Sequence, residues 1–116
     1  MYYLFINSEK EYEELSREIF KSLGIDSYFE GDSSNVMNGY YNSFSFFGVK
    51  FKLEENSYDY EDDYRYMISI AKDRLSKVSC DESIETMIKD VVIKVLQLNM
   101  ENSLAIEIND ELEVIQ

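Results

Sequence analysis

The segment YYNSFSFFGVKFKL, running from Tyr40 to Leu53, decides the fold of this chain. Its side chains alternate with period two, and after Gly48 the apolar residues alternate with Lys50 and Lys52. Period two is the repeat of a β-strand with different surroundings on its two faces. The segment therefore predicts either one long strand bent at Gly48 or two strands that meet there in a tight turn.

Four other short segments also predict strands. Residues 2–6 (YYLFI) are a continuous aromatic and aliphatic run, and residues 64–72 alternate again, with Tyr66, Ile68 and Ile70 on one side. Near the end of the chain, two apolar segments, 104–108 and 112–115, flank the polar residues 109–111. This last pattern predicts a terminal hairpin.

Two segments have the repeat of an amphipathic helix. In residues 8–23, apolar side chains recur every three or four positions, and in residues 82–98 they do so again after Asp81 and an acidic first turn. Ser8 followed by Glu11 fits a capping box at the first helix start, and Gly24 fits a glycine that ends that helix.

Together these segments predict an α+β fold with two amphipathic helices packed on a mainly antiparallel sheet, in the order β-α-β-β-β-α-β-β. The chain has 116 residues, four Gly and no Pro, and no linker or internal repeat divides it. We therefore expect residues 1–116 to form a single domain with one hydrophobic core.

The composition excludes several classes of site. There is no His, so no imidazole base or ligand can exist, and the single Cys80 cannot form an intramolecular disulfide. We expect no catalytic, metal or cofactor-binding residue, and a protein that is not an enzyme. No segment is apolar enough for a membrane span or a signal peptide, which favours a cytoplasmic protein without membrane contact.

The charge is strongly negative: 24 Asp and Glu against 11 Lys and Arg give a net charge of −13. This balance disfavours direct binding of nucleic acid or an anionic membrane, and it favours a basic protein partner. The surplus lies in two segments, 54–63 with six acidic and no basic residues, and 99–116 with five and none.

The first acidic segment is interleaved with tyrosines, a combination found at protein-binding surfaces because tyrosine adds rigid contact area beside the charges. A solvated loop that keeps the protein soluble, or a Ca²⁺ or Mg²⁺ site without the EF-hand spacing, would also account for the acids. The candidate partner-binding residues are Glu54, Glu55, Tyr58, Asp59, Tyr60, Glu61, Asp62, Asp63 and Tyr64.

The central part of the chain, roughly residues 30–70, resembles small bacterial immunity proteins of contact-dependent growth inhibition and related polymorphic toxin systems. The resemblance lies in the segments 30–35 (EGDSSN), 38–41 (NGYY), 47–51 (FGVKF), 59–64 (DYEDDY) and 67–70 (MISI). It implies a cytoplasmic protein that binds and neutralises a cognate toxin domain at the C-terminal end of a large exoprotein, often a nuclease with a basic active-site face.

Charge and resemblance together predict a non-enzymatic inhibitor that occludes the active site of a basic toxin, with the acids of 59–63 pairing with toxin Lys or Arg. Two alternatives stay open. One is a phage-encoded, anti-CRISPR-like acidic inhibitor of a nucleic-acid-binding effector, in which carboxylates mimic phosphates. The other is a small acidic enzyme or metal-responsive module.

Overall fold

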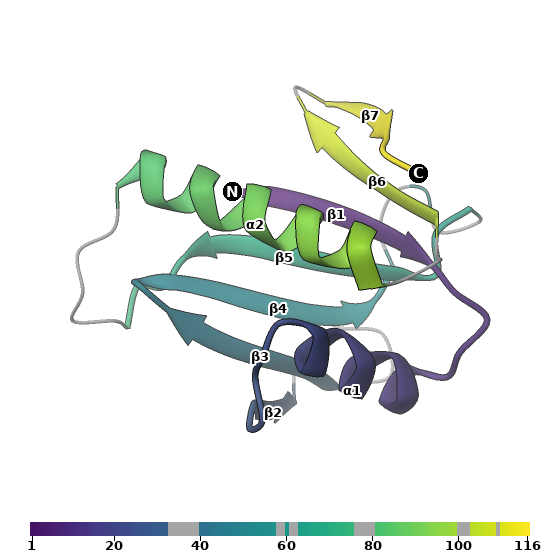
Figure 1. Cartoon of the computed structure of the whole chain (residues 1–116), viewed down its shortest axis with the longest axis horizontal. Coiled ribbons are helices and arrows are strands. Elements are labelled where there is room, and N and C mark those ends of the chain that lie inside the picture. The colour runs from purple at the N-terminus through teal and green to yellow at the C-terminus, as the bar shows by residue number, and fades with distance from the viewer. Residues whose placement is uncertain (33–39, 58–59, 61–62, 76–80, 100–102, 109) are drawn as a thin grey trace.

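An antiparallel sheet with both helices on one of its faces is the framework of the molecule (Figure 1). The computed structural model describes residues 1–32, 40–57, 60, 63–75, 81–99, 103–108 and 110–116. Within these ranges the elements are β1 (Tyr2–Asn7), α1 (Tyr12–Ser22), β2 (Phe29–Asp32), β3 (Tyr40–Phe46), β4 (Val49–Glu55), β5 (Tyr66–Lys72), α2 (Glu82–Asn99), β6 (Ser103–Ile108) and β7 (Glu111–Val114).

The strands follow one another across the sheet in the order β2-β3-β4-β5-β1-β6-β7. β1 lies inside the sheet and pairs with β5 on one side and with β6 on the other. Its sequence explains this position, because Leu4 and Ile6 pack toward the helices while Phe5 packs on the opposite face. A strand that is apolar on both faces is stable only when both faces are covered.

The segment 40–53 forms two strands rather than one bent strand. Phe46 pairs with Val49 across a two-residue connection made of Phe47 and Gly48. Both connecting residues have positive φ angles, 53° and 77°, as in the type I′ turn that fits the twist of a hairpin. The sequence left two alternatives open, and the tight turn is the one the chain adopts.

The predicted fold class is confirmed, with one additional short strand. β2 pairs with β3 at the edge of the sheet, so four strands rather than three separate the two helices. The segment Phe29–Asp32 contains two acidic residues and a glycine, and it has no strand pattern of its own. It is extended because it pairs with β3.

The two ends of α1 differ in how well the sequence predicted them. The helix begins at Tyr12 instead of Ser8, and the Ser8 hydroxyl accepts a hydrogen bond from the Lys10 amide, so the predicted capping box is wrong. At the other end, Gly24 has a φ of 75° and its amide donates to the Lys21 carbonyl. These are features of a Schellman motif, and the predicted glycine C-cap is confirmed.

α2 spans Glu82–Asn99, within a residue of the predicted bounds. Asp81 caps it, because its Oδ1 accepts hydrogen bonds from the Ile84 amide at 3.0 Å and the Ser83 hydroxyl at 2.6 Å. No helix in the described part of the chain has the length and apolar content to cross a membrane.

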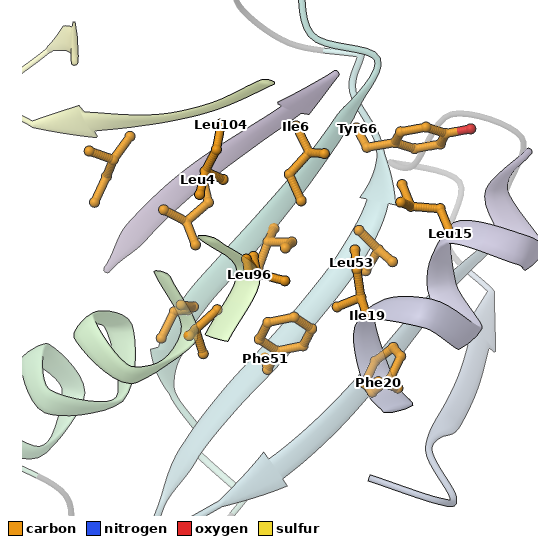
Figure 2. Packing of buried hydrophobic residues seen from close by; sticks show 14 of the residues in the cluster. Leu4, Ile6, Leu15, Ile19, Phe20, Phe51, Leu53, Tyr66, Leu96 and Leu104 are labelled. Atoms are coloured by element: carbon orange, nitrogen blue, oxygen red, sulfur yellow. The ribbon is translucent and has the colours of Figure 1, made fainter. Parts of the chain in front are cut away.

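The main core lies between the helices and the sheet. Figure 2 shows Leu15, Ile19 and Phe20 of α1 against the sheet residues Phe51 and Leu53, and all five are fully buried. Ile88, Val92 and Leu96 of α2 complete the cluster. One face of the sheet is thereby covered by both helices, which leaves the opposite face to be considered as a functional surface.

Candidate functional site

The face of the sheet opposite the helices is here called the open face. Side chains alternate along a strand, and paired residues of neighbouring strands share a face. The register therefore places one set of residues there: Tyr3, Phe5, Tyr41, Ser43, Ser45, Lys50, Lys52, Glu54, Met67, Ser69, Ala71, Ala105 and Glu107. This set mixes aromatic, cationic and anionic side chains.

A small second core covers one end of the open face. Phe5, Met67 and Ala105 are buried there together with Tyr64, and this group is here called the Phe5 cluster. Tyr60 packs edge-on against Phe5, with ring centroids 5.2 Å apart and an interplanar angle of 79°. The described part of the connection between β4 and β5 thus packs on the sheet through Tyr60 and Tyr64.

Hydrogen bonds fix the described part of this connection. The Asn56 amide donates to the Arg65 carbonyl and the Asn56 side chain donates to the Tyr64 carbonyl, each at 2.9 Å. The Tyr64 amide closes a tight turn by donating to the Tyr60 carbonyl at 2.8 Å. Tyr60 adopts a positive φ of 63° in this turn, which shows that the turn is held by its contacts rather than by local preference.

Two of the predicted partner-binding residues are not at the surface. Glu54 is 2 % exposed and Tyr64 is 8 % exposed, because one lies on the sheet and the other belongs to the Phe5 cluster. The expectation that the side chains of Glu54 and Tyr64 are exposed to a partner is therefore corrected. Their role in binding stays a prediction. Glu55 and Tyr60 are half-buried and Asp63 is exposed, whereas Tyr58, Asp59, Glu61 and Asp62 lie outside the described residues.

A pocket of about 380 Å³ lies on the open face beside the Phe5 cluster. This volume is within the range of about 300–1,000 Å³ that is typical of small ligand sites. Four strands contribute its walls, so it depends on the sheet register and not on one segment. The lining residues are Met1, Tyr3, Phe5, Lys52, Glu54, Met67, Ser69 and Glu107.

Glu54 is the unusual group in this pocket. Its Oε2 atom is buried and accepts no hydrogen bond from the described residues, and the Lys52 ammonium is 3.8 Å from it, beyond hydrogen-bonding distance. Burial raises the pKa of the Glu54 carboxyl above its ordinary value, and the charge of Lys52 opposes part of that rise. The carboxylate is therefore held in an environment that leaves it short of donors.

Lys52 is engaged on its other side as well. Its ammonium lies 4.9 Å from the centre of the Tyr41 ring, and the Lys50 ammonium lies 5.7 Å from the same ring. A cation above an aromatic face is attracted by the ring quadrupole. The Lys52 ammonium is therefore shared between the Tyr41 ring and the Glu54 carboxylate.

Glu54 was singled out in the sequence as part of the acidic segment, but the other residues of this pocket were not. One signal for part of it existed, because the period-two pattern of β4 places Lys50, Lys52 and Glu54 on one face. The partners Tyr3 and Glu107 could not be found in this way, since their positions beside β5 follow from long-range strand pairing.

The metal alternative concerned the acidic segment 54–63. Among the described residues, no three acidic or cysteine side chains are grouped so that they could hold a metal ion. Of the six acids in that segment, Glu54 faces the pocket, Glu55 is half-buried and Asp63 is exposed. The other three, Asp59, Glu61 and Asp62, lie outside the described residues.

Similarity to known proteins assigns no function to this pocket or to the open face. Comparison of the chain with protein-family models, with curated proteins and with solved structures found no match. The function is therefore argued from the charge distribution, the open face and its pocket.

Proposed function

We propose that this chain is a non-enzymatic immunity protein that binds a basic toxin domain, of which a nuclease is the expected type, and neutralises it in the cytoplasm. The toxin domain would be the C-terminal part of a large exoprotein. Inhibition would follow from occlusion of the toxin's substrate-binding face, without turnover, at an electrostatically accelerated association rate.

One observation carries the proposal: the fold brings the two acidic segments of the sequence together. Tyr60 from the first segment, Tyr64 directly after it, and Ala105 and Leu112 from the second segment pack in or against the Phe5 cluster. The two segments therefore meet at the Phe5 cluster, and one acid from each, Glu54 and Glu107, lines the pocket beside it. A basic surface would meet both segments in a single approach.

The sequence predicted that the tyrosines add contact area for the partner, but two of them support the proposal by positioning the acidic segment. Tyr60 and Tyr64 hold the acidic connection against the sheet through Phe5, so its ends are positioned before any partner arrives. A pre-positioned loop loses less conformational entropy on binding than a free one. Charge then supplies the attraction, and the aromatic cluster supplies the positioning.

The direct test is co-expression with the basic terminal domain of the exoprotein encoded beside this chain. Growth should be rescued by the unaltered chain, and the purified pair should associate more slowly as salt rises from about 50 mM to about 500 mM. Absence of rescue and of binding would refute the proposal. Loss of nucleic-acid binding by an unrelated effector, without any toxin partner, would favour the phage-inhibitor alternative instead.

A charge-matched pair of variants locates the binding surface. Neutralising Asp59, Glu61, Asp62 and Asp63 together as Asn or Gln should slow association with the toxin. The control neutralises four exposed acids of the helix-bearing side, Glu13, Glu14, Asp26 and Glu82. Equal effects of the two variants would show that net charge alone acts, and would contradict the placement of the surface at 59–63.

A further inference from the structure

The pocket on the open face combines apolar walls with carboxylates. Tyr3, Phe5 and Met67 supply aromatic and thioether surface, and Glu54 and Glu107 bring negative charge. Tyr3 pairs directly with Glu107 on β6 and with Ser69 on β5. An aromatic ring next to a carboxylate is the pairing that binds organic cations, because the ring face and the acid attract the same charge.

Among the described residues, none donates a hydrogen bond to the buried Oε2 atom of Glu54. A buried acceptor without a donor is unfavourable, by more when it is charged. The nearest cation, Lys52, is also held over the Tyr41 ring. Because the terminal torsion of a glutamate is broad, either carboxylate oxygen can turn to a donor that enters the pocket.

We infer that this pocket receives the side chain of one arginine from the partner, with the Glu54 carboxylate accepting its hydrogen bonds. The inference rests on the proposed function, because the arginine belongs to the basic protein partner. Glu107 stands at the same pocket as a second negative charge, and the stem of the arginine packs against Phe5 and Met67.

The donor geometry favours arginine over lysine. A guanidinium is planar, carries five N–H donors and stacks on aromatic faces, whereas an ammonium is a compact, strongly hydrated charge. The pocket offers an aromatic wall in Tyr3 and a donor-deficient carboxylate in Glu54, which match the two properties of the guanidinium. Phosphate or a carboxylate ligand would instead meet two negative side chains, Glu54 and Glu107, against one lysine, Lys52.

The test uses the full chain and a small probe, so that it does not depend on the partner. Arginine amide is titrated into ¹⁵N-labelled protein while the backbone amide signals of Tyr3, Lys52 and Ser69 are followed by NMR. Saturable shifts are expected with arginine amide, and none with citrulline amide, which keeps the shape and the α-amino group but has a neutral ureido group in place of the guanidinium. Equal shifts with the two probes would overturn the inference.

Variants assign the effect to the carboxylate. Glu54→Gln should weaken arginine amide binding by about tenfold or more, because a desolvated charge partner is lost. Glu113→Gln, an exposed residue of β7 whose pairing with Ile106 places it on the other face, removes the same charge and should bind like the unaltered chain. Unchanged binding by Glu54→Gln, or equal losses in both variants, would refute the assignment.

A second variant protects the test if Glu54→Gln folds poorly. Ser69→Phe fills the pocket and leaves Glu54 in place, in a β-strand where an aromatic residue is favourable. It should abolish the shifts caused by arginine amide while the remaining signals stay dispersed. Persistence of saturable binding in Ser69→Phe would place the cation elsewhere and contradict the inference.

The failure of this inference can be told apart from the failure of the proposed function. If the toxin binds Glu54→Gln as tightly as the unaltered chain, and arginine amide gives no shifts, the pocket assignment falls and the immunity function stands. If arginine amide binds in a Glu54-dependent manner but no basic toxin is neutralised, the pocket assignment stands and the proposed function falls.

Discussion

The Tyr12 hydroxyl joins α1 to the backbone of the sheet, and its removal should have a measurable cost. It donates to the Leu53 carbonyl at 2.6 Å and accepts from the Asn42 amide at 2.9 Å. Asn42 and Leu53 are paired residues of β3 and β4. The hydroxyl therefore bridges two backbone groups of neighbouring strands. All three residues are buried.

Tyr12→Phe keeps the ring and leaves one buried N–H and one buried C=O without this partner. An unsatisfied buried group costs about 1–3 kcal/mol. If β3 and β4 move slightly closer together, the freed N–H and C=O groups recover part of that cost. We expect a net loss of about 2 kcal/mol in the free energy of unfolding. For a chain of this length, that corresponds to a fall in Tm of roughly 8 °C.

Thermal unfolding followed by far-UV circular dichroism, together with urea unfolding at constant pH, measures this loss. Tyr28→Phe is the matched control, because Tyr28 stacks on Phe20 and its hydroxyl bonds to no other described residue. The control should change stability by less than about 0.5 kcal/mol. Equal stabilities of the two variants would refute the bridging role of the Tyr12 hydroxyl.

Four further substitutions test other parts of the structure. Gly24→Ala should lose about 1–2 kcal/mol in urea unfolding, because its positive φ disfavours a Cβ although the space is open. Phe47→Asn should raise Tm by a few degrees, since asparagine suits the first position of a type I′ turn; a lower Tm would contradict that geometry. Glu54→Gln should be at least as stable as the unaltered chain at about pH 7. This difference in stability should shrink toward about pH 4.5, because the pKa of Glu54 is raised in the folded state and protonation therefore stabilises the unaltered chain. Asp81→Ala should lower Tm at neutral pH and should lower it less in acid. The hydrogen bonds from Ser83 and Ile84 lower the pKa of Asp81, so the stability that they supply is lost as the pH falls through that pKa. Equal losses of Tm at both pH values would contradict this role of the Asp81 carboxylate.

The elements with strong local patterns were predictable from the sequence. The continuous apolar run 2–6 forms the predicted strand, although its place between β5 and β6 was not predicted. The helical faces of α1 and α2 and the glycine end of α1 also follow from spacing and residue type. In each case the local preference and the final packing agree.

The features that escaped prediction are those decided by distant contacts. α1 begins later than predicted because the Lys10 carbonyl accepts hydrogen bonds from the Tyr66 hydroxyl and the Arg65 guanidinium. These two bonds keep residues 8–10 out of the helix. β2 exists through its pairing with β3. No local pattern contains either of these partners.

The candidate site shows the same limit. Composition correctly identified an acidic, tyrosine-rich segment, but it could not separate a tyrosine that is offered to a partner from one that packs on Phe5, as Tyr60 and Tyr64 do. It also could not bring Glu54 and Glu107 to one pocket, since that depends on the pairing of β4, β5, β1 and β6.

The interior position of β1 has a consequence for how the chain folds. Tyr2 pairs with Ile70 and Tyr3 pairs with Glu107, so the middle of the sheet closes only after long stretches of chain have been brought back to its first strand. Contacts of high sequence separation slow folding, because the entropy of closing each loop is lost before the pairing compensates it. The hairpin of β3 and β4 is the local nucleus that can form earlier. Until β5 and β6 arrive, β1 exposes two unpaired apolar edges, and an incompletely folded chain is most prone to aggregate at that strand.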